Sequence, residues 1–284
     1  MPPTAGRRSS LPFDLIALDV DGTILPDDKE IHPETRAAIH AVADRGATIV
    51  IATGRRWRTA MDVIEPLGAG EYLIQSSGAV IRNIGTAEIL YESYIPGAVA
   101  REIVGLGREM GVTGVWYDTP GRTRKLYVFG RMAGVESLKM YSSRNQAAFV
   151  ETDSFEGLAD AMELVFFGEE QRLRDFEAVL ERRHPADVRT MPWTNYAFAD
   201  LVLEVVSREV SKGSALAWLA SHLGVARDRV LAIGDDVNDK EMIVWAGTGA
   251  AMGNASGPIL EVADLTIGRV GRQGLAEYLT GLLR

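Results

Sequence analysis

Residues 13–23 read Phe-Asp-Leu-Ile-Ala-Leu-Asp-Val-Asp-Gly-Thr, and this stretch decides the fold. Residues 13–18 are mostly apolar and predict a buried parallel strand. Asp19 and Asp21 follow it, and Gly22 then allows the chain to turn. Ligands of open α/β sheets bind beyond the carboxyl ends of strands, where these carboxylates are expected. Alternation along an extended chain would point both carboxylates to one side, so a cation or a shared proton must offset their repulsion. The alternative is a strand that ends in a solvated Asp-Gly turn.

The composition limits the classes of protein that remain. The 284-residue chain is 46% hydrophobic and 24% charged, like ordinary soluble proteins, and is long enough for one large domain or two. A net charge of −9 disfavours nucleic acid as a partner, and the absence of cysteine excludes disulfides and thiolate metal sites. No apolar run reaches the roughly 20 residues of a membrane span. We expect a disordered leader over residues 1–10, no membrane partner and a cytoplasmic location.

The first third of the chain alternates between strands and helices. Apolar runs at residues 47–52 and 71–75 predict two more buried strands, and helical periodicity predicts a helix before each of them. This rhythm implies a parallel sheet with right-handed crossovers. Residues 79–95, with Gly85 in their middle, predict a hairpin instead.

The pattern changes over residues 94–206 and returns to strand–helix alternation after Ser211, a predicted helix N-cap. We therefore expect an α/β fold: a Rossmann-like parallel-sheet core from residues 11–93 and 207–284, with an inserted α+β domain at 94–206. The elements predicted within the insert are helices at 97–110 and 171–183 and strands at 112–117, 125–129, 164–167 and 201–206.

Polar residues from four segments are expected to meet at the carboxyl edge of the core sheet. They are Asp19 and Asp21 after the first strand, Thr53 after the second, Lys212 at a helix start, and residues 235–239 after a later strand. Carboxylates are ligands that Mg²⁺ prefers, and bound Mg²⁺ commonly takes phosphate oxygens as well. Thr53 supplies a hydroxyl, Lys212 a point charge suited to phosphate, and backbone N–H groups around Gly22 and Gly54 could approach an anion. Together these parts describe phosphoryl transfer.

The same segments resemble the motifs of the haloacid dehalogenase (HAD) superfamily, and specifically its Cof-type phosphatases with a type-IIB cap. The Asp-x-Asp-Gly-Thr motif of that family is present at residues 19–23, and residues 52–55 (Ala-Thr-Gly-Arg) resemble its second motif. Residues 211–216 resemble the third motif, and residues 234–239 (Gly-Asp-Asp-Val-Asn-Asp) the fourth. Residues 251–255 (Ala-Met-Gly-Asn-Ala) also match the C-terminal part of the family's core.

The resemblance implies a reaction through an aspartyl-phosphate. Asp19 would be the nucleophile, and Asp21 the general acid for the leaving alcohol and then the base for the hydrolytic water. Mg²⁺ would be held by Asp19, the backbone carbonyl of Asp21 and Asp235. Thr53 and Lys212 would complete the catalytic set, with Lys212 offsetting repulsion between the anionic nucleophile and the anionic ester.

The resemblance also implies substrate contacts. These would come from Gly22, Gly54, Arg55, Ser77 and Asn238, with Asp239 as a supporting residue. Relatives usually carry Asn-Gly-Ala where this chain has residues 77–79, Ser-Gly-Ala. Because serine reaches less far than asparagine, the substitution bears on substrate placement and not on the chemical steps. The inserted domain would face the core and select the leaving group.

Three functions are consistent with these residues. The first is a Mg²⁺-dependent phosphatase acting on a small phosphate ester, such as a sugar phosphate, a phosphoglycolate-like acid or a cofactor phosphate. The second is a phosphomutase of the same chemistry, but nothing in the sequence marks a second sugar-phosphate site. The third is a non-catalytic ligand-binding protein, which has no need of a nucleophile and an acid.

A basic segment lies within the predicted insert. Between Arg122 and Arg144 there are six basic residues and one acid, Glu136. One or two of these cations could bind a second anionic group of the substrate. The alternative is a solvated face whose charges balance acids elsewhere.

Overall fold

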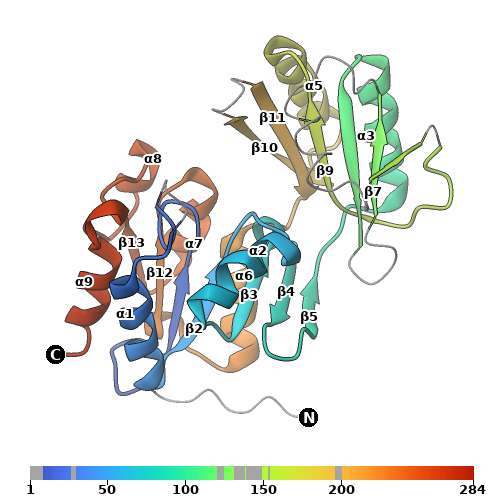
Figure 1. The fold of residues 1–284 in the computed structure, drawn as a ribbon. Coiled ribbons are helices and arrows are strands. Elements are labelled where there is room, and N and C mark those ends of the chain that lie inside the picture. Colours follow the sequence, from blue (N-terminus) through green and yellow to red (C-terminus); the bar gives the residue numbers. More distant parts are fainter. Residues whose placement is uncertain are drawn as a thin grey trace. The chain divides into compact units, whose positions relative to one another are not determined.

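The computed structural model describes residues 9–26, 30–119, 125–130, 138, 149–152, 154–195 and 200–284 (Figure 1). The chain forms two compact units. We call the part up to Glu92 and from Ser211 onward the core unit, and Ser93–Val210 the inserted unit. Because the chain leaves the core unit after Glu92 and returns at Ser211, the core unit needs both outer segments.

An eight-stranded sheet forms the centre of the core unit. Its strands, in spatial order, are β14 (Leu265–Thr266), β13 (Thr248–Ala251), β12 (Val230–Gly234), β1 (Leu15–Leu18), β2 (Thr48–Ala52), β3 (Tyr72–Gln75), β4 (Val80–Asn83) and β5 (Ile89–Glu92). Neighbours from β14 to β3 pair in parallel, whereas β3–β4 and β4–β5 pair antiparallel. The chain proceeds from β1 to β2 on one side and from β12 to β13 on the other. The carboxyl end of β1 is thus the switch point at which such sheets bind ligands.

Helices cover the sheet on both faces. The α-helices of the core unit are α1 (Pro33–Asp44), α2 (Trp57–Leu67), α6 (Lys212–Leu223), α7 (Lys240–Trp245), α8 (Gly257–Leu260) and α9 (Gly274–Gly281). Ile16 and Leu18 of β1 pack in one apolar cluster with α1, α2 and α9. Leu15 and Ala17 pack in another with α6, α7 and α8. Since both faces of β1 are buried, its sequence is apolar throughout, which confirms the buried parallel strand predicted there.

Short 3₁₀ turns lie among these elements. They are η1 (Ser76–Gly78), η3 (Arg227–Arg229), η4 (Val237–Asp239) and η5 (Val270–Arg272). The predicted N-cap of α6 is confirmed. The Ser211 hydroxyl accepts a hydrogen bond from the Ser214 amide at 2.9 Å, and the Ser211 amide donates to the Ser214 hydroxyl at 3.0 Å. This reciprocal cap fixes the first turn of α6, and with it the backbone of Lys212.

The inserted unit is built on a second sheet, of six strands. In spatial order these are β10 (Val188–Asn195), β11 (Asp200–Ser207), β9 (Ala161–Phe167), β6 (Thr113–Asp118), β7 (Leu126–Phe129) and β8 (Phe149–Glu151). Only β7 and β8 pair in parallel among these strands. Apolar residues of α3 (Gly97–Glu109) and α5 (Glu170–Arg183) share one cluster with the sheet, in which the Trp116 ring stacks on Phe155 at 5.6 Å.

The two ends of the inserted sheet depart from the prediction. β8 and β10 were not expected, because β8 is short and β10 contains Pro192 among polar residues. Among the described strands β10 pairs only with β11, so it is an edge strand of the described sheet, the position in which a proline is tolerated because it has no N–H to donate.

The start of the chain also differs from the expected leader. Residues 1–8 lie outside the described residues, but Ser9 is hydrogen-bonded to the core unit. Its amide donates to Asp14 at 2.8 Å and its hydroxyl to the carbonyl of Arg45 at 3.1 Å. In the described part of the chain, no helix has the length and apolar character that crossing a membrane requires.

Candidate active site

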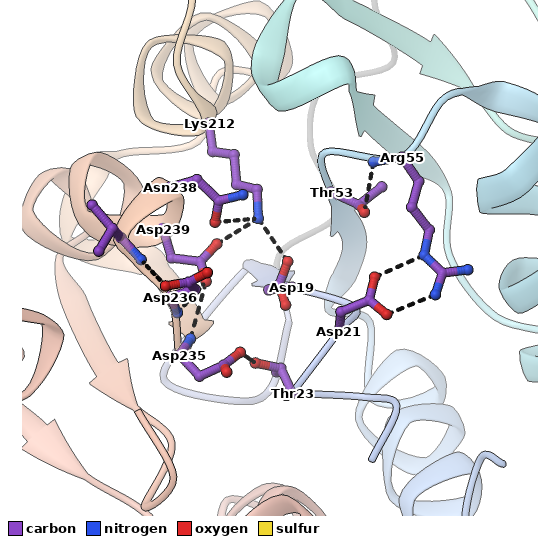
Figure 2. A network of polar contacts seen from close by, with 11 residues as sticks. Asp19, Asp21, Thr23, Thr53, Arg55, Lys212, Asp235, Asp236, Asn238 and Asp239 are labelled. Atoms are coloured by element: carbon purple, nitrogen blue, oxygen red, sulfur yellow. Dashed lines mark hydrogen bonds and ion pairs between the residues drawn. The ribbon is translucent and has the colours of Figure 1, made fainter. Parts of the chain in front are cut away.

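The chain turns immediately after β1, and this turn separates the first two carboxylates. The amides of Ile24 and Leu25 donate to the carbonyl of Val20 at 3.0 and 2.8 Å. The side chain of Asp19 is buried, whereas that of Asp21 is 44% exposed. The strand alternation that predicted a shared direction therefore does not extend to Asp21. Two different cations offset the two charges (Figure 2).

Asp19 shares Lys212 with Asp239. The ammonium of Lys212 donates to Oδ1 of Asp19 and to Oδ1 of Asp239, both at 2.6 Å, and to the side-chain oxygen of Asn238 at 3.2 Å. Lys212 is the first residue of α6, where the helix dipole disfavours a cation. The two carboxylates offset this cost and allow the side chain of Lys212 to be 1% exposed.

The protonation equilibria of this cluster follow from burial and charge. Burial, and then the neighbouring Asp239 carboxylate, hold the pKa of Asp19 well above its ordinary value. Burial alone would lower the pKa of Lys212, but the carboxylates of Asp19 and Asp239 raise it overall. Lys212 therefore stays protonated, and a cation bound beside Asp19 would lower the pKa of Asp19 toward its ordinary value.

Asp235 follows β12 and accepts hydrogen bonds from two distant segments. The Thr23 hydroxyl donates to Oδ1 at 3.0 Å, and the Asn254 amide lies 3.4 Å from Oδ2. Asp239 supports this loop, since its Oδ2 accepts the backbone amide of Asp235 at 3.0 Å. Burial, and then the Asp239 carboxylate, raise the pKa of Asp235 to about 7.

Because Gly22 has no side chain, the carboxylate of Asp235 can pack directly against its backbone. A Cβ atom at this position would lie 2.1 Å from Oδ2 of Asp235, and φ at Gly22 is +89°. Both observations require glycine. The N–H of Gly22 donates to the carbonyl of Leu25 at 2.8 Å and thereby closes the turn.

Asp21 is bound by Arg55. The guanidinium Nε donates to Oδ2 of Asp21 at 2.8 Å, and Nη2 donates to Oδ1 at 2.7 Å. Thr53, which is 1% exposed, lies beside them, and its hydroxyl oxygen accepts the Arg55 amide at 3.1 Å. The hydroxyl hydrogen of Thr53 is left to donate elsewhere.

Ser77 lies at the same edge of the sheet. A Cβ atom on Gly54 would come within 3.4 Å of the Ser77 hydroxyl and 3.8 Å of the Asn238 amide nitrogen, so three of the predicted substrate contacts lie together. Ser77 is 3% exposed and has a left-handed backbone conformation, with φ 56°. Its amide donates to the carbonyl of Thr53 at 3.2 Å.

The buried charges of the site do not balance. One oxygen of each of Asp19, Asp235 and Asp239 lies within 4.8 Å of the other two, and all three residues are suited to hold a metal ion. Lys212 is the one cation that pairs with this trio among the described residues. An all-oxygen donor set with an excess of negative charge fits Mg²⁺.

The structure thus brings together the site residues that the sequence predicted, and their metal and substrate roles stay predictions. The Asp21 carboxylate binds Arg55, and Asp239 is the third carboxylate near Asp19 and Asp235. Sequence reasoning assigned no role to Thr23 and Asn254, although both lie in segments that match the family's motifs. Of the basic segment between residues 122 and 144, Arg122, Arg124, Arg131, Lys139 and Arg144 lie outside the described residues, and Lys125 is exposed.

Comparison with known proteins identifies the family. The model of the haloacid dehalogenase-like hydrolases matches residues 16–279. A putative phosphatase of Bacillus subtilis, YxeH, is 30% identical over 95% of this chain and 98% of its own, and an HMP-PP phosphatase of Serratia proteamaculans is 28% identical over 96% of both. The crystal structure of a haloacid dehalogenase-like hydrolase from Bacteroides thetaiotaomicron has a TM-score of 0.79 at 27% identity, covering 95% of this chain and 99% of that one. The resemblance inferred from the motifs is confirmed: the chain belongs to the haloacid dehalogenase-like hydrolases and is an enzyme of their phosphatase branch.

Proposed function

We propose that this protein is a Mg²⁺-dependent phosphatase that hydrolyses a small phosphate monoester through an aspartyl-phosphate. The carboxylate of Asp19 carries the proposal. Lys212 binds its Oδ1 at 2.6 Å, while its Oδ2 accepts no hydrogen bond from the described part of the chain. Solvent reaches this oxygen, which leaves it open to an incoming cation or phosphoryl group.

The two carboxylates after β1 suit two different tasks. In the first step Asp19 forms a bond to phosphorus, the bond between phosphorus and the ester oxygen breaks, and Asp21 gives its proton to the leaving oxygen. In the second step Asp21 takes a proton from water, whose oxygen attacks phosphorus and releases phosphate and the Asp19 carboxylate. The buried Asp19 suits the nucleophile, and the half-exposed Asp21 suits a group that exchanges protons with the alcohol and with water.

The reaction brings an anionic ester to an anionic nucleophile. Lys212 is fixed beside Asp19 and offsets part of that repulsion. Asp19, Asp235 and the backbone carbonyl of Asp21 would hold Mg²⁺, which supplies the remaining positive charge when bound. The Thr53 hydroxyl and the Gly54 amide are the donors we expect at the phosphoryl oxygens.

The substrate is expected to be a small metabolite. The inserted unit would act as the cap that selects the leaving group, and Ser77, Arg55 and Asn238 would border the phosphoryl group. The relatives reported above are named as phosphatases, one of them for HMP-PP. We therefore include HMP-PP together with sugar and cofactor phosphates among the compounds to be tested.

Phosphate release from p-nitrophenyl phosphate tests the proposal. We expect release with Mg²⁺, none with excess EDTA, and none from Asp19→Asn with Mg²⁺. Release that EDTA leaves unchanged would refute the metal dependence. Conversion of glucose 1-phosphate to glucose 6-phosphate without net phosphate release would favour the phosphomutase, and Mg²⁺ binding without any turnover over a panel of phosphate esters would favour a binding protein.

A further inference from the structure

Asn254 joins three segments of the core unit. It lies after β13, in the segment Ala-Met-Gly-Asn-Ala that matches the family but had no role assigned. Its side-chain amide nitrogen donates to the carbonyl of Gly22 at 2.9 Å and lies 3.4 Å from Oδ2 of Asp235. Its side-chain oxygen accepts the backbone amide of Val270 at 3.0 Å.

The partners of Asn254 fix the orientation of its amide group. The N–H of Val270 can only donate, so the side-chain oxygen must face it. The carbonyl of Gly22 can only accept a hydrogen bond, and so can the carboxylate of Asp235 while it is ionised. The side-chain NH₂ group of Asn254 must therefore face both of them. A flipped amide would lose these contacts together. The side chain of Val270 packs against the apolar core of the unit and gives Asn254 a firm support.

Asp235 is held at both of its carboxylate oxygens. Thr23 donates to Oδ1 and Asn254 lies against Oδ2, so the two donors together limit rotation of the carboxylate. Asn254 also holds Gly22, whose missing side chain leaves room for the same Oδ2 atom. A single amide thus fixes both the carboxylate and the backbone turn against which the carboxylate packs.

We propose that Asn254 is a positioning residue for the metal site: it holds Asp235 and the turn at Gly22 in the arrangement that binds Mg²⁺. The inference rests on the proposed function, because it concerns the same cation. Groups that orient a metal ligand without touching the metal typically contribute 10- to 100-fold to metal affinity. Since the contact with Asp235 is long, we expect about tenfold for Asn254, at the lower end of that range.

Metal binding to the full-length protein tests the role of Asn254 without recourse to turnover. Free Mn²⁺ is followed by its electron paramagnetic resonance signal, with Mg²⁺ as competitor, in the wild type and in Asn254→Ala. We expect the dissociation constants for both ions to rise about tenfold. The matched control is Asn83→Ala. Asn83 accepts the Thr86 amide at 2.9 Å in the β4–β5 turn and should leave both constants unchanged.

A second variant acts on Asn254 without altering it. Val270→Pro removes the N–H that orients the Asn254 amide. Val270 is the first residue of η5, where proline fits, and Arg269 before it has φ −77° and ψ 149°, which a following proline favours. We expect Mn²⁺ binding to weaken in the same direction as in Asn254→Ala, by a smaller factor. This variant decides the question if Asn254→Ala does not fold.

Asp235→Asn distinguishes a failure of the proposed metal site from a failure of the proposed role of Asn254. If the wild type and Asp235→Asn bind Mn²⁺ equally, the proposed metal site itself is wrong. If Asp235→Asn loses binding while both Asn254→Ala and Val270→Pro stay within about twofold of the wild type, the metal site stands and the role of Asn254 is overturned. Weaker binding in either Asn254→Ala or Val270→Pro, with Asn83→Ala unchanged, supports it.

Discussion

Arg55 holds Asp21 through two parallel hydrogen bonds, Nε to Oδ2 at 2.8 Å and Nη2 to Oδ1 at 2.7 Å. A third donor, Nη1, is used by the carbonyl of Thr59 at 3.2 Å, in the first turn of α2. The guanidinium is thus fixed to a helix and presents a planar pair of donors to one carboxylate, a geometry that lysine cannot reproduce. Sequence reasoning placed Arg55 at the substrate, whereas its partner in the structure is the proposed acid.

Arg55→Ala should slow the release of poor leaving groups. Without Arg55, the Asp21 carboxylate loses the group that orients it. Because Asp21 is 44% exposed, the pair contributes at most about 1 kcal/mol, so we expect kcat for an alkyl phosphate to fall about fivefold. The loss for p-nitrophenyl phosphate should be smaller, because its leaving group needs little protonation. Arg58→Ala, at an exposed position of the same helix, is the control. If kcat/KM fell equally for both substrates, and only because KM rose, Arg55 would instead be assigned to phosphate binding.

Asp19→Asn should abolish turnover and leave the fold intact. An amide cannot attack phosphorus, and removing one of three clustered carboxylates relieves repulsion that burial strengthens. We expect no phosphate release and a Tm in EDTA that is equal to or above that of the wild type. Asp236→Asn, next to the site but exposed, should retain turnover within a fewfold. Turnover by Asp19→Asn within tenfold of the wild type, after mass spectrometry has excluded deamidation, would contradict the nucleophile assignment.

Lys212→Met should destabilise the core unit most strongly when metal is absent. The change leaves Asp19 and Asp239 buried without their cation, and removing one partner of a buried ion pair costs about 3–5 kcal/mol. Urea unfolding in EDTA at pH 8 measures this loss, and adding Asp239→Asn to the variant should restore part of it. A loss below about 1 kcal/mol, as for an exposed pair, would mean that solvent reaches Lys212.

Mg²⁺ binding should strengthen as pH rises through about 7. The pKa of Asp235 is raised to about 7 in the metal-free fold, so protons compete with Mg²⁺ for this carboxylate below that pH. An unfolded Asp has a pKa of about 3.9, so the metal-free folded state binds this proton more tightly than the unfolded state does. The resulting stabilisation is present at low pH and is lost as pH rises from about 4 to 7. The Tm difference between samples with Mg²⁺ and samples with EDTA should therefore grow as pH rises. Asp235→Asn should make this growth smaller. A Tm difference between Mg²⁺ and EDTA that stays constant from pH 5 to pH 8 would contradict the expectation.

The core unit was predictable because its strands are buried on both faces. A run such as residues 15–18 must be apolar at every position, and the polar residues after it then mark the carboxyl edge of the sheet. Lys212 was predictable for a related reason, since a cation at the start of a helix requires an anion nearby. These are local rules that the sequence displays directly.

Other features depend on contacts between residues far apart in the chain. Thr23 and Asp235 are 212 positions apart, and Gly22 and Asn254 are 232 apart, so no local pattern indicates that they meet. The Asp21–Arg55 pair arises because the chain turns after β1. The alternation of side chains applies only within an extended strand, so it does not predict where Asp21 points. In the inserted unit, β10 was missed because Pro192 is unfavourable in a strand unless that strand is at an edge, and edge position is a property of the whole sheet.

The point at which the chain re-enters the core unit bears on whether the insert can be exchanged. Ser211 is the first residue of that unit after the insert, it caps α6, and Lys212 follows at once. The carbonyl of Ser211 occupies the space left by Gly78, where a Cβ atom would lie 2.2 Å away, so residues of the core unit itself hold this junction. Replacing the whole segment between residues 93 and 210 would leave unchanged the contacts of Ser211 that fix the backbone of Lys212. If the insert selects the substrate, as we propose, replacing this one contiguous segment would change substrate preference and leave the proposed nucleophile and its lysine in place.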